Sequence, residues 1–261
     1  MPKENQRISP VRLVVAVIVG LLLANLSVAT SAKAAAGDCK PALPERNLVI
    51  ATSKVEGFGT LQKFEPLPLA AGEYVLTFDD GPVAATTPGI LETLRANCLH
   101  ATFFMIGRNA EKNPELARAV LEQGHSVGSH SYSHRNLATL PHAEGQEEIE
   151  KGNAAVEKAI YGEPRSKAGR LFRFPNNVGT PELISDARRL GMTIASYDIS
   201  PADWRGNPPE QTLERLRMYL KSRDRGVIVL HDAQPNTVPL LPMVIADLRT
   251  RHATIVHIVA E

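Results

Sequence analysis

Two pairs of residues that bind metals in proteins occur at spacings that would let them share one cation. His130 and His134 are four residues apart in the run HSYSH, and histidines at this spacing lie on one side of a helical turn. Asp79 and Asp80 are adjacent, follow an apolar run and precede a Gly-Pro turn. Two imidazoles and one carboxylate leave open positions on a metal for water and substrate. The two pairs together therefore predict metal-assisted hydrolysis.

Three further stretches place polar residues directly after apolar runs. They contain Arg173, the pair Asp203 and Trp204, and His231. Each has a common structural explanation when taken alone: a surface ion pair for Arg173, a helix cap for Asp203, and a partly buried side chain for His231. Five polar clusters that each follow an apolar run favour one shared functional site. The remaining histidines show no spacing typical of metal ligands.

The elements that must position these residues alternate between short apolar runs and amphipathic stretches of helical length from residue 73 onward. Strands are predicted at 48–51, 74–78, 101–106, 126–128, 171–174, 193–197, 227–230 and 254–258. Helices are predicted near 87–97, 113–123, 143–161, 180–190, 209–223 and 238–250. This alternation predicts an α/β fold with a parallel sheet, whose functional groups gather at the carboxyl ends of the strands. Periodicity alone leaves open whether the sheet closes into a barrel.

The first 36 residues are predicted to be a targeting segment that is not part of the folded domain. Basic residues precede the run 13–32, which carries no charge, and small residues with two A-x-A patterns follow it. This order is typical of a cleaved signal peptide, but the run is also long enough for an uncleaved membrane anchor. Both alternatives place the rest of the chain outside the cytoplasm, either periplasmic or secreted.

Composition limits the kind of protein further. The chain has 261 residues and a formal charge of +1, and loss of 1–36 would change the charge to −2. This balance argues against a protein that neutralises many phosphates, so no nucleic-acid partner is expected. The two cysteines, Cys39 and Cys98, could form a disulfide in an exported chain or remain free thiols. Residues 37–72 lack a sustained period and are predicted to form an irregular lead-in with one short strand.

The five clusters resemble, in their order, the motifs of the polysaccharide deacetylases that share the NodB homology domain (carbohydrate esterase family 4). The motifs are TFDDGP at 77–82, HSYSH at 130–134, RFP at 173–175, DW at 203–204 and LHD at 230–232. The resemblance covers roughly residues 73–258. It implies that residues 73–261 form a single domain, a distorted (β/α) barrel that is expected to be seven-stranded.

The resemblance also implies a role for each matching residue. The implied metal ligands are Asp80, His130 and His134, with zinc as the usual ion and cobalt or nickel as alternatives. The implied catalytic residues are Asp79 as general base, Arg173 as the group that holds Asp79 ionised and oriented, His231 as general acid and Asp203 as the group that tunes His231. A bound metal lowers the pKa of its water, and a histidine is suited to protonate a leaving amine.

Three residues are expected to contact the substrate. The family usually has a tyrosine directly after the proline of its third motif, whereas this chain has Asn176. The backbone N–H of Asn176 can still stabilise an oxyanion, but the loss of an aromatic wall affects substrate preference. Trp204 and Tyr132 are candidates both for stacking on sugars and for simple packing at the rim.

These expectations lead to one main functional hypothesis and two alternatives. The main hypothesis is hydrolytic removal of N-acetyl groups from an N-acetylglucosamine polymer or oligomer, such as chitin or peptidoglycan, with release of acetate. The first alternative is an O-deacetylase acting on acetylated xylan or another O-acetylated glycan, motivated by Asn176. The second is a glycan-binding protein without catalytic activity, against which the complete set of metal, base and acid residues argues.

Overall fold

The structure is a computed structural model that describes residue 39 and residues 41–163 and 169–261. The predicted signal peptide or anchor at 1–36 lies outside the described residues. The strands are β1 (Glu45–Ile50), β2 (Gly57–Phe58), β3 (Glu73–Asp79), β4 (Thr102–Met105), β5 (Ser126–Ser129), β6 (Arg170–Phe172), β7 (Met192–Ala195), β8 (Gly226–His231) and β9 (Thr254–Ala260). The helices are α1 (Thr87–Ala96), α2 (Gly107–Lys112), α3 (Pro114–Glu122), α4 (His142–Tyr161), α5 (Pro181–Arg189), α6 (Pro209–Ser222) and α7 (Thr237–Thr250).

The strands form one parallel sheet in the order β1-β9-β3-β4-β5-β6-β7-β2, and β8 also pairs with β3. The segment that follows β7 pairs with β8 at one position only, through a parallel bridge between Ile199 and Ile228. Strands β8, β3, β4, β5, β6 and β7 therefore lie side by side in that order, and the sheet is barrel-like but is not closed by pairing between β7 and β8. The described part of the sheet has nine strands rather than the seven expected, because β1 and β2 before these six strands and β9 after them extend it.

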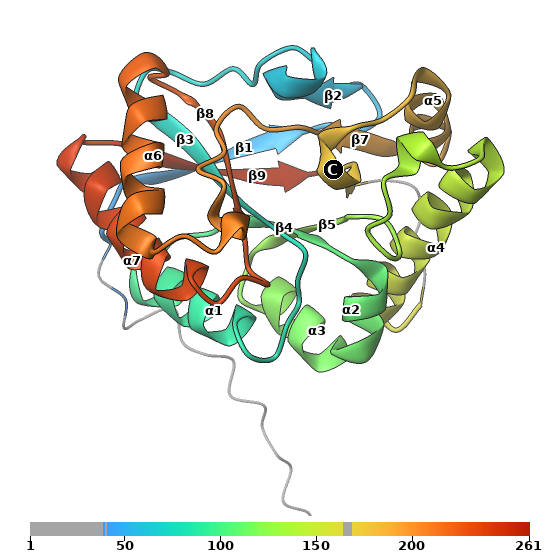
Figure 1. The fold of residues 1–261 in the computed structure, drawn as a ribbon, viewed down its shortest axis with the longest axis horizontal. Helices are drawn as coiled ribbons and strands as arrows, with labels where there is room; N and C mark the ends of the chain where they lie inside the picture. Colours follow the sequence, from blue (N-terminus) through green and yellow to red (C-terminus); the bar gives the residue numbers. More distant parts are fainter. Residues whose placement is uncertain (1–38, 40, 164–168) are drawn as a thin grey trace, which may run out of the picture. The chain divides into compact units, whose positions relative to one another are not determined.

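Helices cover the outside of the strands (Figure 1). Proline occupies one of the first two positions of α1, α3 and α5, where its missing N–H leaves no helical hydrogen bond unmade. The helix α2 was not predicted, because it spans six mostly polar residues between the end of β4 and Pro114. Among the described residues, no helix combines the length and apolar character needed to cross a membrane.

The strands are buried on both faces, which explains why they appear in the sequence as continuous apolar runs. In β3, six of the seven residues are buried, and in β8, five of six. One apolar cluster lies between the sheet and the helices and includes Phe78, Phe103 and Leu230. A second draws Phe104 and Val227, among others, from different strands. This packing fixes the strand ends on which the polar clusters lie.

The segment 37–72 contributes two strands to the sheet. β1 pairs with β9 along six residues, and β2 pairs with the end of β7. The strand predicted at 48–51 starts three residues earlier, at Glu45. Cys39 and Cys98 form a disulfide with 5.4 Å between their Cα atoms, which ties the start of this segment to the turn before β4.

Candidate active site and metal-binding group

Asp80, His130 and His134 lie together at the carboxyl ends of β3 and β5. Oδ1 of Asp80 is 3.6 Å from Nε2 of His130 and 3.3 Å from Nε2 of His134. Each residue offers one ligand atom, and the three atoms lie within 4.8 Å of one another. The structure thus brings together the three residues that the sequence analysis assigned to a metal.

One hydrogen bond orients the ring of His130, and another holds the backbone of His134. Nδ1 of His130 donates to the backbone carbonyl of Arg173 at 2.7 Å, which leaves Nε2 free to face Asp80. Burial lowers the pKa of His130 against the opposing charges of Asp79 and Asp80, so burial favours the neutral imidazole that binds metals. His134 has a left-handed backbone with φ of 63°, and its N–H donates to the Ser131 hydroxyl.

The residues present fit a divalent metal. Oδ1 of Asp80 is buried and has no hydrogen-bond partner among the described residues. An unpaired buried carboxylate oxygen is costly unless a cation compensates it, and here two imidazole nitrogens face the same oxygen. One carboxylate and two imidazoles are a donor set typical of catalytic sites for zinc and related transition metals.

Asp79 lies between the metal-binding group and a fully buried arginine. Oδ1 of Asp79 accepts a hydrogen bond of 2.6 Å from Arg173, whose side chain is 0% exposed. Oδ2 of Asp79 lies 3.8 Å from Nε2 of His130. One carboxylate oxygen is therefore held by a fixed positive charge while the other faces the metal-binding group.

Arg173 is itself held rigidly. Its guanidinium also donates to the hydroxyl of Thr77 and to the backbone carbonyls of Ala195 and Ser196. Its Cζ lies 4.1 Å from the centre of the Phe104 ring, close enough for a cation–π interaction. Sequence reasoning did not identify Thr77, although it stands in the TFDDGP motif. This network fixes the position of the Arg173 guanidinium and so holds its positive charge beside Asp79.

His231 and Asp203 form a second pair at the end of β8. Nδ1 of His231 contacts Oδ1 of Asp203 at 2.8 Å, and Oδ2 of Asp203 accepts hydrogen bonds from the His231 N–H and the Thr237 hydroxyl. Burial by itself would lower the pKa of His231, but the hydrogen bond and charge of Asp203, with the charges of Asp79 and Asp80, raise this pKa to about 9. The imidazole is thus kept protonated near neutral pH.

The strand register brings this pair next to the first group. Asp79 and His231 are direct partners in the parallel ladder of β3 and β8. Because the carboxyl ends of neighbouring parallel strands lie at one edge, the side chains of Asp79 and His231 start from the same edge of the sheet on adjacent strands.

The three predicted substrate residues have different surroundings. Asn176 is exposed and has a left-handed backbone with φ of 55°. Trp204 is 52% exposed and adjacent to Asp203, and the guanidinium carbon of Arg205 lies 5.1 Å from the centre of its ring. In contrast, the Tyr132 ring lies under Lys151, and its hydroxyl donates to Glu111, so these contacts hold it to α2 and α4.

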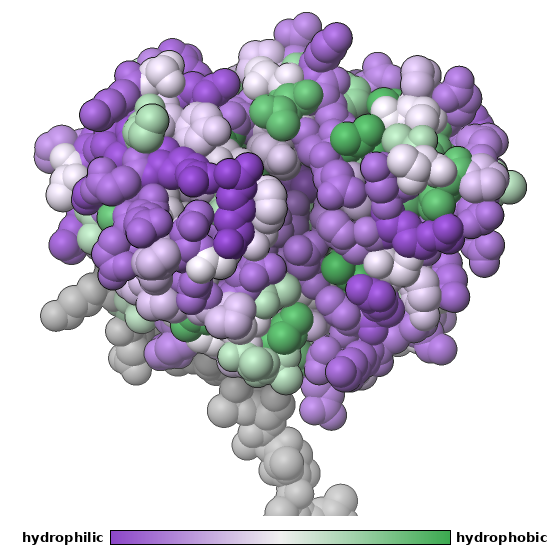
Figure 2. Space-filling view, in the orientation of Figure 1, coloured by the Kyte–Doolittle hydropathy of each residue, from purple (hydrophilic) through white to green (hydrophobic). Residues whose placement is uncertain are grey.

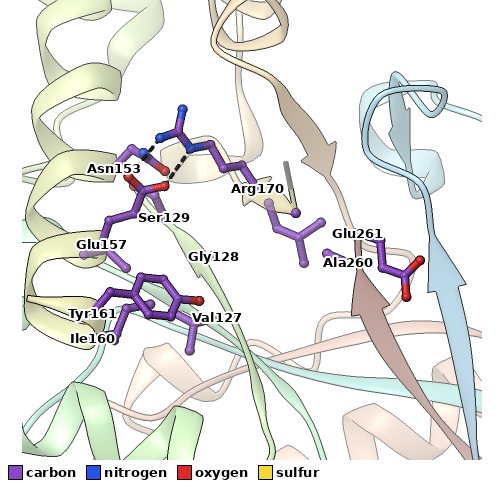
Figure 3. A pocket seen from close by; sticks show the side chains of 13 residues that line it. Val127, Gly128, Ser129, Asn153, Glu157, Ile160, Tyr161, Arg170, Ala260 and Glu261 are labelled. Atoms are coloured by element: carbon purple, nitrogen blue, oxygen red, sulfur yellow. Dashed lines mark hydrogen bonds and ion pairs between the residues drawn. The ribbon is translucent and has the colours of Figure 1, made fainter. Parts of the chain in front are cut away.

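The surface and cavities add two facts. The face in Figure 2 is mostly hydrophilic, with small, separate hydrophobic patches and a hollow near its middle. A cavity of about 270 Å³ is lined by residues of α4, β5 and β6 and by the end of β9 (Figure 3). Its lining includes the paired Glu157 and Arg170 but none of the metal-binding or catalytic candidates.

Comparison with known proteins assigns the family. The polysaccharide deacetylase family profile matches residues 68–195. A chitooligosaccharide deacetylase of Azorhizobium caulinodans is 30% identical over 61% of this chain and 73% of that protein. A peptidoglycan-N-acetylglucosamine deacetylase of Bacillus cereus is 29% identical over 72% of this chain and 68% of that protein.

A solved structure supports the same assignment. The peptidoglycan deacetylase of Bdellovibrio bacteriovorus superposes with a TM-score of 0.71 at 29% identity, over 84% of this chain and 59% of the other. This chain therefore spans less than two thirds of that larger protein. The parallel α/β fold, the sequence matches and the grouped acidic and histidine side chains agree: the chain belongs to the polysaccharide deacetylase family of hydrolases.

Proposed function

We propose that this protein is a divalent-metal-dependent N-deacetylase of an extracytoplasmic glycan that contains N-acetylglucosamine. The observation that carries the proposal is the arrangement of Asp80, His130 and His134 beside the arginine-held carboxylate of Asp79. The relatives named above act on chitooligosaccharides and on peptidoglycan, which supports an N-acetylglucosamine substrate. The disulfide between Cys39 and Cys98 supports an oxidising compartment.

A cation held by Asp80, His130 and His134 would lower the pKa of water and polarise the acetyl carbonyl. Zinc suits this donor set best, with cobalt or nickel as substitutes. Asp79 then accepts the proton of the attacking water, since its free oxygen faces the metal-binding group. The backbone N–H of Asn176 donates to the oxygen that gains negative charge.

His231 completes the reaction by protonating the leaving nitrogen. The new bond joins the water oxygen to the carbonyl carbon, and the bond between that carbon and the nitrogen breaks. An amine leaves poorly unless it is protonated, and Asp203 keeps the imidazole charged until the proton moves. The products are acetate and a free amino group on the sugar.

The proposal is tested by measuring acetate release. The metal-loaded protein is incubated with chitin oligosaccharides and with peptidoglycan, and the products are identified by mass spectrometry. We expect release from at least one substrate, loss of release after chelation of the metal, and recovery on adding zinc. Zinc binding without acetate release from either substrate would overturn the proposal.

A second candidate function, O-deacetylation of xylan or a similar glycan, is favoured by one observation. Asn176 stands where the family usually has an aromatic ring, and it is exposed, so the wall around the acyl group differs. Ester hydrolysis needs no protonated nitrogen and depends less on His231. Parallel assays on matched acetyl esters and acetamides therefore separate the two functions.

A further inference from the structure

Asp232, which follows the proposed acid His231, has no role in the reaction described above. Its carboxyl is buried, with the residue 1% exposed. Oδ2 accepts a hydrogen bond of 2.6 Å from the hydroxyl of Thr87, which is also buried. Oδ1 has no hydrogen-bond partner among the described residues. A buried carboxyl that is only partly satisfied is costly, so its position requires an explanation.

The Thr87 hydroxyl links this carboxyl to the turn that follows β3. The N–H of Val83 donates to Oγ1 of Thr87 at 2.8 Å, and the same oxygen donates its proton to Asp232. Thr87 begins α1. One hydroxyl thus connects the turn, the start of a helix and the end of β8.

The Asp232 carboxyl also lies directly against the turn, at Gly81. A Cβ atom placed on Gly81 would overlap both carboxylate oxygens of Asp232, so the glycine permits a close approach. The N–H of Asp232 donates to the carbonyl of Asp79 at 3.2 Å. Asp232 therefore touches the peptide chain on both sides of the metal ligand Asp80.

Asp80 needs such support because of its backbone. Its φ is 78°, a left-handed conformation that is strained for a residue other than glycine. On the side of α2, Nδ2 of Asn109 donates to the carbonyl of Asp80 at 2.7 Å, and Nδ2 of Asn113 to that of Pro82 at 3.1 Å. Amides hold one side of the turn, and Asp232 with Thr87 holds the other.

We propose that Asp232 is a positioning residue that, through Thr87 and Gly81, fixes the turn carrying Asp80 and thereby the geometry of the metal-binding group. The inference rests on the proposed function, since it assumes that Asp80 binds the metal. Residues behind metal ligands typically change metal affinity about 10- to 100-fold. The prediction for this chain is a loss of affinity in that range.

The test compares three variants with a matched control. Asp232→Asn replaces the carboxyl by an amide, Thr87→Val removes only the hydroxyl, and Gly81→Ala pushes the turn away from the carboxyl. The control is Asp198→Asn, another buried carboxyl at a strand end that accepts a threonine hydroxyl, from Thr60 at 2.7 Å. Thr87→Val keeps every charge, so it carries the test if Asp232→Asn fails to fold.

Three quantities are measured on the full chain: the zinc dissociation constant by competition with a chromogenic chelator, the visible spectrum with cobalt bound, and the melting temperature without metal. We expect about tenfold or greater loss of zinc affinity and an altered cobalt spectrum for the three variants. Asp198→Asn should lower the melting temperature while affinity and spectrum stay as in the wild type.

The outcomes separate the two proposals. A wild-type protein that binds neither zinc nor cobalt would overturn the proposed function. A wild-type protein that binds both, together with variants whose affinity and spectrum are unchanged, would overturn the positioning role alone. Equal loss of affinity in Asp198→Asn would also overturn it, because the effect would then reflect general destabilisation.

Discussion

The structure holds two clusters of histidines, one at each end of the strands, and they differ in what surrounds the rings. His125 immediately precedes β5 and His130 immediately follows it, so one short strand separates two buried imidazoles with opposite surroundings. The carboxyl-end cluster is His130, His134 and His231, each of which has a carboxylate within 4 Å. The amino-end cluster is His100, His125 and His257.

In the amino-end cluster the rings mainly face one another. The His100 ring centre lies 5.7 Å from that of His125 and 5.3 Å from that of His257. Nδ1 of His100 contacts Glu45 at 2.7 Å, and Nε2 of His257 contacts the Ser126 hydroxyl at 3.1 Å. Because the ring nitrogens of His100 and His257 contact different partners, the imidazoles of this cluster do not share one carboxylate.

The comparison teaches that several carboxylates gathered around the rings, and not histidines alone, mark the carboxyl end, because in the amino-end cluster a single carboxylate, Glu45, contacts His100 and raises its pKa. Burial, together with the charges of His100 and His257, lowers the pKa of His125 to about 3. At the other end burial acts on His231 too, yet neighbouring carboxylates raise its pKa to about 9. The surroundings thus keep His125 neutral at one end and His231 protonated at the other.

The largest effect that would sharpen this contrast is expected from Asp79→Asn. An amide cannot take up the proton, and a general base contributes about 10²- to 10⁴-fold, so kcat should fall about 10³-fold. Zinc binding should persist, because Asp79 is not one of the three proposed ligands. Acetate release and equilibrium dialysis measure the two quantities. His257→Gln at the amino end serves as control, and an equal loss of kcat there would contradict the contrast.

A smaller but still large effect concerns stability in acid. The folded-state pKa of His125 is about 3, below the unfolded value of about 6.5, so the unfolded chain binds a proton first. Stability is therefore lost as pH falls below about 6.5, by about 3 kcal/mol from this residue alone at about pH 4. His257, whose pKa burial lowers to about 4, adds to the loss.

Urea unfolding at a series of pH values measures this loss. His125→Asn keeps an acceptor for the N–H of Ala101, which now donates to Nδ1 at 3.3 Å, and should flatten the acid slope. His252→Asn is the control, because His252 is exposed and its left-handed backbone suits asparagine. A slope that is equally steep in the wild type and in His125→Asn would show that the amino-end cluster does not govern acid stability.

The third effect lies on the alkaline side and belongs to the carboxyl end. His231 must be protonated to act as acid, so kcat/KM should fall as pH rises through the pKa of about 9. In Asp203→Asn the lowering effect of burial prevails, and the fall should move to lower pH by about one unit or more. A pH–rate profile of both proteins measures the shift. An unchanged alkaline limb would remove His231 from the role of acid.

Much of this fold follows from the sequence because the strands are buried on both faces. The apolar runs around Leu76 and Ile228 predicted β3 and β8, and their carboxyl ends predicted where polar groups would meet. β2 could not be predicted, since its two residues are extended only through pairing with β7. Such pairing depends on tertiary contact and leaves no period in the sequence.

The candidate site was likewise predicted only in part. Residue types and spacing grouped Asp80 with His130 and His134, because metal ligands are few in kind. The support behind them was missed: Thr87 and Asp232 are 145 residues apart, and a hydroxyl bound to a carboxyl has no characteristic spacing. The signal for Asp232 was its place in the LHD motif, where only the histidine was given a role.

The smallest expected effect is on KM, and it would distinguish Trp204 from Tyr132 at the carboxyl ends of the strands. Trp204 is 52% exposed, and stacking on an aromatic ring is worth about 1 kcal/mol, so Trp204→Ala should raise KM roughly fivefold with kcat unchanged. Tyr132→Phe removes only the hydrogen bond to Glu111 and should leave KM as it is. Steady-state kinetics on a chitin oligosaccharide measures both. If Tyr132→Phe raises KM as much as Trp204→Ala does, Tyr132 also contacts the sugar, and the exposed indole is not the main platform.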